Sequence, residues 1–325
     1  MKKLARTPGW KKAVTRFPEN ARAEIDSIWD NRGVLSADAV ARLLVTPQAQ
    51  IGTLMMQLLP VAQQYAVVPV SHYQVGALAA GMPRPGTSWC SLYLGANFEF
   101  TNVALSFTAH AEQAATNNAW LSGEPGIQAL AISAAPCGYC RQFLYELVTA
   151  KDLSILLPSE PTNPLTFSST PLSTFLPDAF GPSDLGVTGG LMDPKLCSHN
   201  LALNSASPAD PVIAAALGGA SGSYTPYKTD RSYGYAGVAV QLADGSIYAG
   251  RHAENAAYNP SLSPLQSALT FMNMGQPLGA TRIVNRCVLV EVPTLASQLS
   301  ATEAALAAYA PTVRLEYYTA RIVSP

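Results

Sequence analysis

The chain has 325 residues, of which 13% are charged, and its formal net charge is −1. This length accommodates two domains with separate cores, and the balanced charge gives no electrostatic attraction to nucleic acid or to a membrane surface. No apolar run approaches the roughly 18 residues of a membrane span, and none follows the basic N-terminus as in a secretory signal. Five cysteines are a low, odd number that does not indicate a disulfide framework, so we expect a reducing, cytoplasmic setting.

Residues 1–60 are expected to form a helical N-terminal segment. ENARAEIDSIWDN has apolar residues at helical spacing, and Ser36 is a typical N-cap for the helix that follows it. From about residue 66 the pattern changes to strands, in AVVPVSHYQVGALAAG and WCSLYLGANFEF, followed by a helix, the strand IQALAISAA and another helix. This alternation predicts an α/β domain over residues 61–157.

Residues 158–211 contain nine of the 25 prolines and show little periodicity. They are expected to form an ordered but irregular connector. A second domain is expected over residues 212–325, because strands resume in YAGVAVQLADGSIYAG, where Asp244-Gly245 is a strong hairpin signal.

The second domain looks like a degenerate copy of the first. GALAAG followed by SLYLGANFEF aligns with GVAVQL followed by SIYAGRHAEN. The alternative is that two hairpins share a similar strand composition. The alignment pairs Tyr93 with Tyr248, Gly95 with Gly250 and Glu99 with Glu254.

Metal-binding residue types gather at two predicted helix N-termini. Thr108 is expected to cap a helix that carries His110 and Glu112 in its first turn. Pro136 suits the first position of the next helix, whose first turn then presents Cys137 and Cys140 on one face. A helix N-terminus favours thiolate over thiol, and thiolate is the form that binds metal.

One neutral imidazole and two thiolates provide three ligands for Zn²⁺ and leave a fourth position for water, which is the pattern of a catalytic zinc site. The charges of this set sum to zero, so the pKa of a bound water is expected to approach about 7. Glu112 is placed beside the metal without being a ligand, where it can take the proton of that water.

H-x-E followed by P-C-x-x-C is the signature of zinc deaminases. More closely, the chain resembles the long, two-lobed, homodimeric cytidine deaminases of bacteria and plants. The motifs YQVGALAAG, YLGANFEF, HAEQAATNNAWLSGE, PCGYCRQFLYEL, LPDAFGP and AENAAYNPSLSPLQSAL carry the resemblance, which extends from about residue 66 to residue 270.

The resemblance implies a role for each matching position. Glu112 matches the proton shuttle, and His110, Cys137 and Cys140 match the ligands of one Zn²⁺ per chain. The segment Asn97-Phe98-Glu99 matches a substrate-binding segment in which Asn97 and Glu99 hydrogen-bond the ribose. Tyr73 and Phe180 are implied to flank the base, with Phe180 supplied by the partner subunit.

The implied fold is a three-layer α/β/α sandwich with a mixed sheet of about five strands in each of two lobes. The second lobe is degenerate, and the catalytic pockets of the homodimer lie at lobe contacts. The implied reaction, part of pyrimidine salvage, is hydrolytic deamination of cytidine and 2′-deoxycytidine to the uridines and ammonia. In that reaction, Zn-activated hydroxide attacks C4 of the base. Because the Glu99 carboxylate would repel a 3′-phosphate, free nucleosides are the expected partners rather than nucleic acid.

A second His-Ala-Glu tripeptide, residues 252–254, does not predict a second site. Cys287 is the one cysteine after residue 255, and the repeat places the tripeptide opposite residues 97–99. Other hypotheses remain open: a zinc deaminase acting on bases in RNA or DNA, a C-x-x-C oxidoreductase or zinc-stabilised interaction module, and a deaminase that has lost activity.

Overall fold

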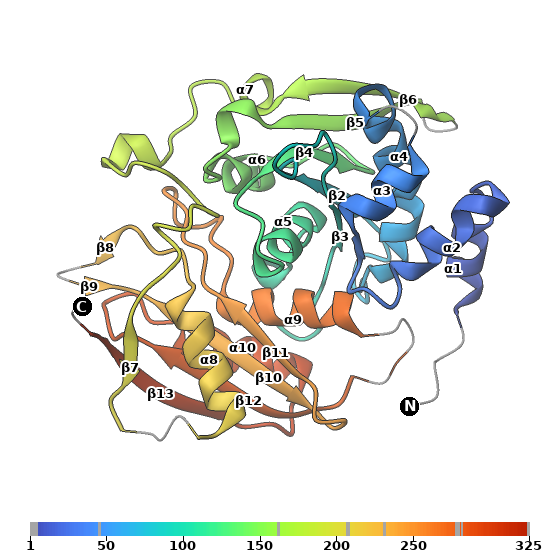
Figure 1. Ribbon diagram of the computed structural model, residues 1–325. Helices are drawn as coiled ribbons and strands as arrows, with labels where there is room; N and C mark the ends of the chain where they lie inside the picture. Colours follow the sequence, from blue (N-terminus) through green and yellow to red (C-terminus); the bar gives the residue numbers. More distant parts are fainter. Residues whose placement is uncertain are drawn as a thin grey trace.

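Figure 1 shows a computed structural model of the chain, which describes residues 6–44, 47–160, 163–205, 209–229, 232–276, 280 and 282–323. In these residues two mixed sheets face each other across a layer of helices, and a further helix covers the outer face of each sheet. No helix in the described ranges is long and apolar enough to cross a membrane. The α/β class and the two-lobed architecture expected from the sequence are confirmed.

The N-terminal segment is helical, as predicted. It contains α1 (Pro8–Val14), α2 (Glu19–Ser27), α3 (Ala37–Leu43) and α4 (Pro47–Ala62). The side chain of Ser36 accepts a hydrogen bond from the Ala39 N–H, which confirms its predicted role as the N-cap of α3. Strand β1 (Val34–Leu35) joins this segment to the first sheet by pairing with β3.

The first lobe is built on a sheet with the strand order β1-β3-β2-β4-β5-β6. Strands β4 and β5 are parallel, and the other neighbours are antiparallel. Residues 66–75, which were expected to form a strand, are a loop tied to the sheet by a bridge between Val67 and Phe98. The strands are β2 (Gly76–Gly81), β3 (Leu92–Ala96), β4 (Ile127–Ile132), β5 (Ser154–Glu160) and β6 (Asn163–Pro171), and the inner helices are α5 (Ala111–Leu121) and α6 (Gly138–Tyr145).

Strand alternation explains how this sheet is covered on both faces. Ala77 and Ala79 belong to the same apolar cluster as the α5 residues Ala111 and Ala115. Leu78 and its neighbour Ala80 belong to the cluster that contains α4. Successive side chains of a strand point to opposite faces, so a continuously buried strand separates two helices.

The proline-rich range 158–211 is less irregular than its composition predicts. Strand β6 pairs antiparallel with β5 at the edge of the first sheet, and β7 (Leu201–Leu203) pairs with β13 at the edge of the second. Proline is tolerated at a sheet edge, where a missing backbone N–H interrupts no ladder. Short helices α7 (Leu172–Phe175) and η4 (Pro182–Leu185) lie between these strands.

The second lobe repeats the first. Its sheet has the order β11-β10-β12-β13-β7, and β12 and β13 form the parallel pair. Helix α8 packs on the outer face, and α9 and α10 pack on the inner face. The elements are α8 (Pro211–Ser221), β8 (Lys228–Thr229), β9 (Ser232–Tyr233), β10 (Ala236–Leu242), β11 (Ile247–Arg251), α9 (Pro264–Gly275), β12 (Val284–Glu291), α10 (Leu299–Tyr309) and β13 (Leu315–Ile322).

Matching backbone contacts confirm the internal repeat. Phe98 bridges to Val67 and to Ala109, and Ala253 makes the two equivalent bridges to Tyr224 and Leu262. The predicted turn at Asp244-Gly245 joins β10 to β11, with Gly245 at a φ of 86°. One apolar cluster contains residues of α5, α9 and both sheets, so the lobes share a core.

Candidate metal centre and substrate cavity

The helix that presents His110 begins two residues later than the sequence predicts. His110 itself is the N-cap of α5, and its backbone N–H donates to Oε1 of Gln113 at 3.1 Å. Thr108 is therefore not the cap, and it lines the cavity instead. The sequence analysis did not single out Gln113, although a glutamine three residues after a cap is a recognisable helix-start signal.

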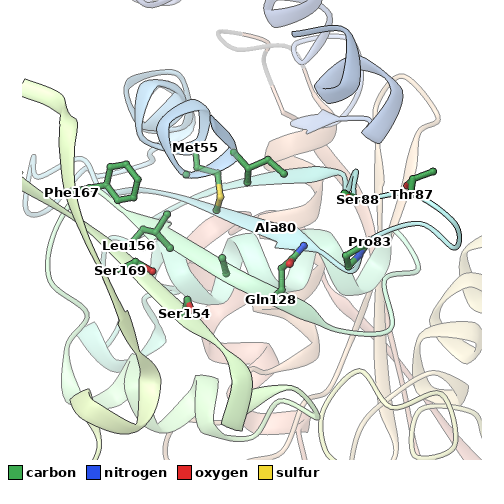
Figure 2. A pocket seen from close by; sticks show the side chains of 13 residues that line it. Met55, Ala80, Pro83, Thr87, Ser88, Gln128, Ser154, Leu156, Phe167 and Ser169 are labelled. Atoms are coloured by element: carbon green, nitrogen blue, oxygen red, sulfur yellow. The ribbon is translucent and has the colours of Figure 1, made fainter. Parts of the chain in front are cut away.

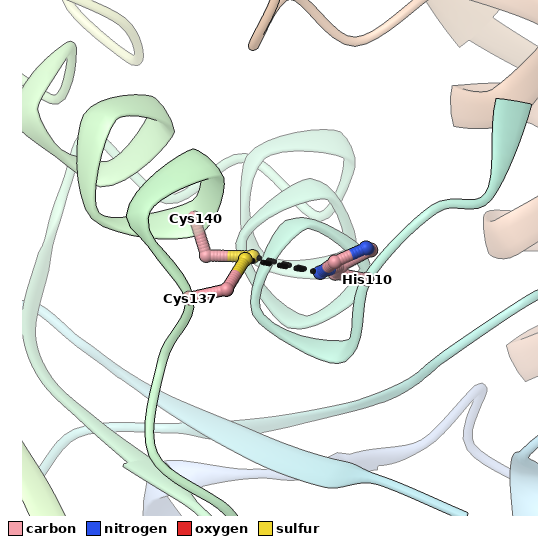
Figure 3. Close-up of side chains that lie close together, drawn as sticks. All are labelled: His110, Cys137 and Cys140. Carbon is pink, nitrogen blue, oxygen red and sulfur yellow. Dashed lines mark hydrogen bonds between the residues drawn. The ribbon is translucent and has the colours of Figure 1, made fainter. Parts of the chain in front are cut away.

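The cysteines lie at the start of α6. Cys137 is the N-cap residue and Cys140 is in the first turn, while Pro136 precedes the helix. The Arg141 guanidinium donates to the carbonyl oxygen of Pro136 at 2.8 Å and to that of Phe175 at 3.0 Å, which fixes the approach to the helix. Both thiols consequently point in the direction of His110 (Figure 3).

The three predicted ligands converge. Nδ1 of His110 lies 3.5 Å from Sγ of Cys137 and 3.3 Å from Sγ of Cys140 (Figure 3). Among the described residues these side chains form the one group of at least three that could hold a metal ion, with ligand atoms within 4.8 Å of one another. Tetrahedral zinc with ordinary Zn–N and Zn–S bonds requires nitrogen and sulfur to be about 3.5 Å apart. The donor set therefore fits Zn²⁺.

The protonation of the two thiols also favours a metal. A hydrogen bond from Cys140 lowers the pKa of Cys137 to about 5, against the opposing effect of burial, and the backbone N–H of Cys140 acts in the same direction. The same side-chain hydrogen bond, together with burial, raises the pKa of Cys140. The pair thus shares a proton that a bound zinc ion would displace, because the metal ligand is the thiolate.

Glu112 follows His110 on α5 and lines the same cavity. Its side chain is 4% exposed, and burial raises the pKa of its carboxyl group. A carboxyl group with a raised pKa can hold and release a proton near neutral pH. Its role as the proton shuttle stays a prediction.

The cavity next to these residues has a volume of about 270 Å³. It brings together Tyr73, Asn97 and Glu99 of the predicted substrate-binding residues with two of the predicted metal ligands, His110 and Cys137. Tyr73 lies at the rim, with 63% of its surface exposed. The lining residues are Ser71, Tyr73, Val75, Asn97, Glu99, Thr108, His110, Ala111, Glu112, Ala134, Ala135 and Cys137.

Asn97 and Glu99 organise one wall of this cavity. Oδ1 of Asn97 accepts from the Val75 N–H at 2.9 Å, and its Nδ2 donates to the Tyr73 carbonyl at 2.9 Å. Oε2 of Glu99 accepts from two backbone N–H groups, those of Val70 and Ser71, at 3.0 Å each, and Oε1 accepts from the Ser71 hydroxyl. Burial opposes ionisation of Glu99, but these hydrogen bonds prevail and lower its pKa, so it lines the cavity as a carboxylate.

Ser71 was not predicted as a site residue, because it falls in the stretch expected to be a strand. Pro69 in that stretch was the available signal, since proline within an apolar run argues against a central strand.

Two predicted residues do not line the cavity. Phe98 is fully buried and its ring packs against Phe100 and Tyr309, at centroid separations of 5.3 and 5.7 Å. Its inclusion in the substrate site was wrong, because side chains alternate in extended backbone and Phe98 faces away from its neighbours. Phe180 is 46% exposed and is absent from the lining of this chain's cavity.

A larger hollow of about 510 Å³ lies on the other face of the first sheet (Figure 2). Met55 of α4, Leu156 of β5 and Phe167 of β6 contribute to its walls. The sheet separates it from α5, since Leu156 belongs to the apolar cluster of α4. It is therefore not part of the metal centre.

Comparison with known proteins assigns the chain to a family. Models of the cytidine and deoxycytidylate deaminase zinc-binding region match residues 50–156 and residues 172–306. A cytidine deaminase from Aliivibrio fischeri is 40% identical over 94% of this chain and 96% of its own length. One from Sodalis glossinidius is 43% identical over 85% of this chain and 86% of its own. The chain belongs to the cytidine deaminase family.

Membership of the cytidine deaminase family makes this protein a zinc-dependent hydrolase that acts on a nucleoside, which confirms the expected enzyme class and the expected metal. A solved cytidine deaminase structure from Mycobacterium tuberculosis is 30% identical and covers 39% of this chain and 95% of that chain, with a TM-score of 0.31.

The second cytidine deaminase lobe lacks the metal-binding residue types. Ala77 pairs with Ile132 in the first sheet and Val238 pairs with Leu289 in the second, so AAPC at 134–137 corresponds to EVPT at 291–294. The bridges at Ala109 and Leu262 align α5 with α9. The counterparts of His110, Glu112, Cys137 and Cys140 are Ser263, Leu265, Thr294 and Ser297.

His252 of the second tripeptide has a packing role. It takes the place of Asn97. Its Nδ1 lies 3.5 Å from the carbonyl oxygen of Gly234, where Asn97 donates its Nδ2 to the Tyr73 carbonyl at 2.9 Å. Its ring is buried, which lowers its pKa to about 4 and keeps it neutral. The non-catalytic character expected of the second lobe stays a prediction.

Proposed function

We propose that the protein hydrolyses cytidine and 2′-deoxycytidine to uridine and 2′-deoxyuridine with release of ammonia, as a step of pyrimidine salvage in the cytoplasm. The supporting observation is the joint position of Glu112 and Glu99 in one cavity with His110 and Cys137. One carboxyl group lies beside the metal ligands, where the base reacts, and the other is held by the 70–71 backbone, where the sugar is recognised.

The protein residues divide the work as follows. His110, Cys137 and Cys140 would hold one zinc ion, which when bound supplies Lewis-acid activation of water. Glu112 accepts a proton from that water and delivers it to N3 of the base as the new C–O bond forms at C4. Glu112 then takes the proton of the new C4 hydroxyl group and delivers it to the amino group, which leaves as ammonia as the C4–N bond breaks and the C4 carbonyl forms. The buried setting of Glu112 favours the protonated state that delivery requires.

Sugar recognition is assigned to Asn97 and Glu99. Glu99 is held as a carboxylate by donors from Val70 and Ser71, and it retains lone pairs that can accept the ribose 3′-hydroxyl. Because the proposed contact is to the 3′ position, both the ribonucleoside and the deoxyribonucleoside satisfy it. A 3′-phosphate would place negative charge against this carboxylate.

Base recognition is assigned to Tyr73 and to Phe180 of the partner subunit in a homodimer. Tyr73 already lies at the rim of the cavity. Phe180 is exposed on this chain, and its carbonyl oxygen accepts from Nε2 of Gln142 at 2.7 Å, which anchors the loop on the surface of α6. An exposed aromatic residue on an anchored loop is suited to close a neighbouring subunit's pocket.

Ammonia release from four substrates tests this function: cytidine, 2′-deoxycytidine, cytidine 3′-phosphate and a cytosine-containing single strand. We expect the two nucleosides to react, and the two phosphorylated substrates to react at least about a hundredfold more slowly, since like-charge repulsion of a few kcal/mol gives such a factor. Glu99→Gln should reduce the difference in the rate of ammonia release between cytidine and cytidine 3′-phosphate.

Faster turnover of the single strand than of cytidine would instead support a nucleic-acid deaminase. Cys137→Ala should release one equivalent of zinc and abolish ammonia release. Unchanged metal content in this variant would instead support the oxidoreductase or interaction-module hypothesis.

A further inference from the structure

Helix α6 carries the two cysteines at its start and is attached to the second lobe at its end. Glu146, the C-cap residue, is completely buried. Its Oε1 accepts hydrogen bonds from two hydroxyl groups, that of Tyr224 at 2.8 Å and that of Tyr227, and its Oε2 accepts from the Ala256 N–H at 2.9 Å. All three donors belong to the second lobe.

A second connection lies one turn earlier on the same helix. Nε2 of Gln142 donates to Oδ1 of Asn255 at 3.3 Å, and Nδ2 of Asn255 donates back to the Gln142 carbonyl at 2.9 Å. Asn255 is fully buried and directly follows Glu254, the counterpart of Glu99. Asn255, which follows the second-lobe counterpart of residues 97–99, is therefore hydrogen-bonded to the helix that bears the two cysteines.

The helix that bears His110 is held by the same lobe. Nδ2 of Asn117 on α5 donates to the Ser267 carbonyl at 2.9 Å and to the Thr270 hydroxyl at 3.1 Å, while the Ser267 hydroxyl donates to Oδ1 of Asn117 at 2.7 Å. Both ligand-bearing helices are thus hydrogen-bonded to the second lobe. The second lobe therefore sets the position of the His110 nitrogen relative to the sulfur atoms of the two cysteines.

We propose that Glu146 is a positioning residue for the zinc ligands, which fixes Cys137 and Cys140 relative to His110 by holding α6 against the second lobe. This inference rests on the zinc site described above. Zinc–ligand distances tolerate only about 0.2 Å of error, and α6 is a rod of about 12 Å. A small displacement of its buried end therefore moves the two thiols far enough to weaken zinc binding.

Neutralising Glu146 is a severe change for this connection. Its oxygens accept from two hydroxyls and one backbone N–H, so an amide in its place cannot accept from all three and leaves a buried donor unpaired. The change lies six residues from Cys140 and does not alter the ligand set.

Glu291 offers a matched control. It is also a buried carboxylate with three donors: the Ser297 hydroxyl at 2.6 Å, the Gln298 N–H at 2.8 Å and the Tyr317 hydroxyl at 2.9 Å. These groups all lie in the second lobe. Glu291→Gln therefore has a similar chemical cost without acting on α6.

The experiment compares zinc release from full-length Glu146→Gln, Glu291→Gln and wild type to a chromogenic chelator, alongside thermal unfolding. We expect both variants to unfold at a lower temperature, but only Glu146→Gln to release zinc faster, by about tenfold or more as for other groups that orient metal ligands. Zinc release at the wild-type rate from Glu146→Gln, or equally fast release from Glu291→Gln, would overturn the positioning role.

If Glu146→Gln does not fold, Tyr227→Phe removes a single donor to the same carboxylate and is measured in the same way, with the same expected and contrary results. Absence of zinc from the wild type would contradict the zinc function itself. A zinc-loaded wild type with unchanged release from the variants would contradict the positioning role alone.

Discussion

Glu112 shows how a single position can set a protonation state. It lies two residues from His110, in the first turn of α5, where the backbone turns its carboxyl group into the cavity. Because its side chain is almost completely buried, desolvation disfavours the charged form. In the proposed reaction, this is the proton that Glu112 would deliver to N3 of the base.

Glu112→Gln should abolish most of the activity while the protein remains folded and zinc-loaded. The amide has the size of the carboxyl group but cannot exchange a proton, and loss of a general acid–base group costs about 10²–10⁴-fold in rate. Loss of cytidine absorbance measures the rate, and metal analysis checks zinc content. Equal rates in variant and wild type would remove Glu112 from the mechanism.

The residues of the metal centre could be predicted because their chemistry is visible in the sequence. His110, Cys137 and Cys140 have types and spacings that few other functions share. It was harder to predict which side chains of an extended segment face the cavity. Phe98 belongs to the substrate-binding motif, but a motif does not indicate where each side chain points. Strict alternation of side chains along the segment would have predicted that Phe98 faces the core.

At the scale of single elements, close packing of a helix on a strand positions the cavity. A Cβ added to Gly95 of β3 would lie 2.1 Å from the backbone nitrogen of Ala115 on α5. The same holds in the second lobe, where a Cβ on Gly250 would lie 2.1 Å from the nitrogen of Ala268. Glycine at both positions lets a helix lie directly on the strand, which explains why the repeat keeps it.

Gly95→Ala should therefore destabilise the protein and impair the metal centre. The extra methyl group would push α5 away from β3, and overpacking of this kind costs about 1–3 kcal/mol. The free energy of unfolding by urea and the zinc content measure the two effects.

Gly218→Ala is the control for this prediction, because a Cβ there has no atom within 4 Å and the residue lies within α8. It should be neutral or stabilising by up to about 1 kcal/mol. Equal destabilisation by the two changes would contradict the packing argument.

Elements defined by local periodicity were predicted well, and those that depend on distant pairing were not. Helices α2 and α3 and the β10–β11 hairpin follow from local patterns. Strand β6 does not, because its prolines hide an edge strand that forms only by pairing with β5. The start of α5 was misplaced because histidine is an uncommon N-cap residue. The hydrogen bond at this cap is accepted by the side chain of Gln113, from the backbone N–H of His110.

At the scale of the whole molecule, the contact between the lobes contains two acidic side chains. Glu254 lies near Glu146, and its Oε2 accepts from the Tyr227 N–H at 3.4 Å. Burial raises the pKa of Glu254 to about 8, the Tyr227 N–H opposes the shift, and the negative charge of Glu146 adds to it. The folded protein thus keeps a proton that the unfolded chain releases at a pH of about 4.3.

Stability should therefore fall as the pH rises through this range. The contribution of the Glu254 proton is complete below about pH 4.3 and is lost as the pH approaches 8, since the folded state binds the extra proton. Glu254→Gln, which carries no titratable group, should show a smaller loss of unfolding free energy between pH 5 and pH 8. Parallel pH profiles of the two proteins, measured by urea unfolding, would contradict this assignment.

The crossing of β7 to the far sheet constrains any attempt to divide the protein. This strand precedes α8 in the chain and pairs with the outer edge of β13, for example through Ala320 and Leu203. A fragment that starts at α8 would lack β7 and leave the edge of β13 unpaired. Unpaired edge strands pair with strands of other chains and cause aggregation. Severing the polypeptide just after β6, in contrast, keeps each sheet whole, so co-expressed halves divided there are the ones that should reassemble without forming aggregates.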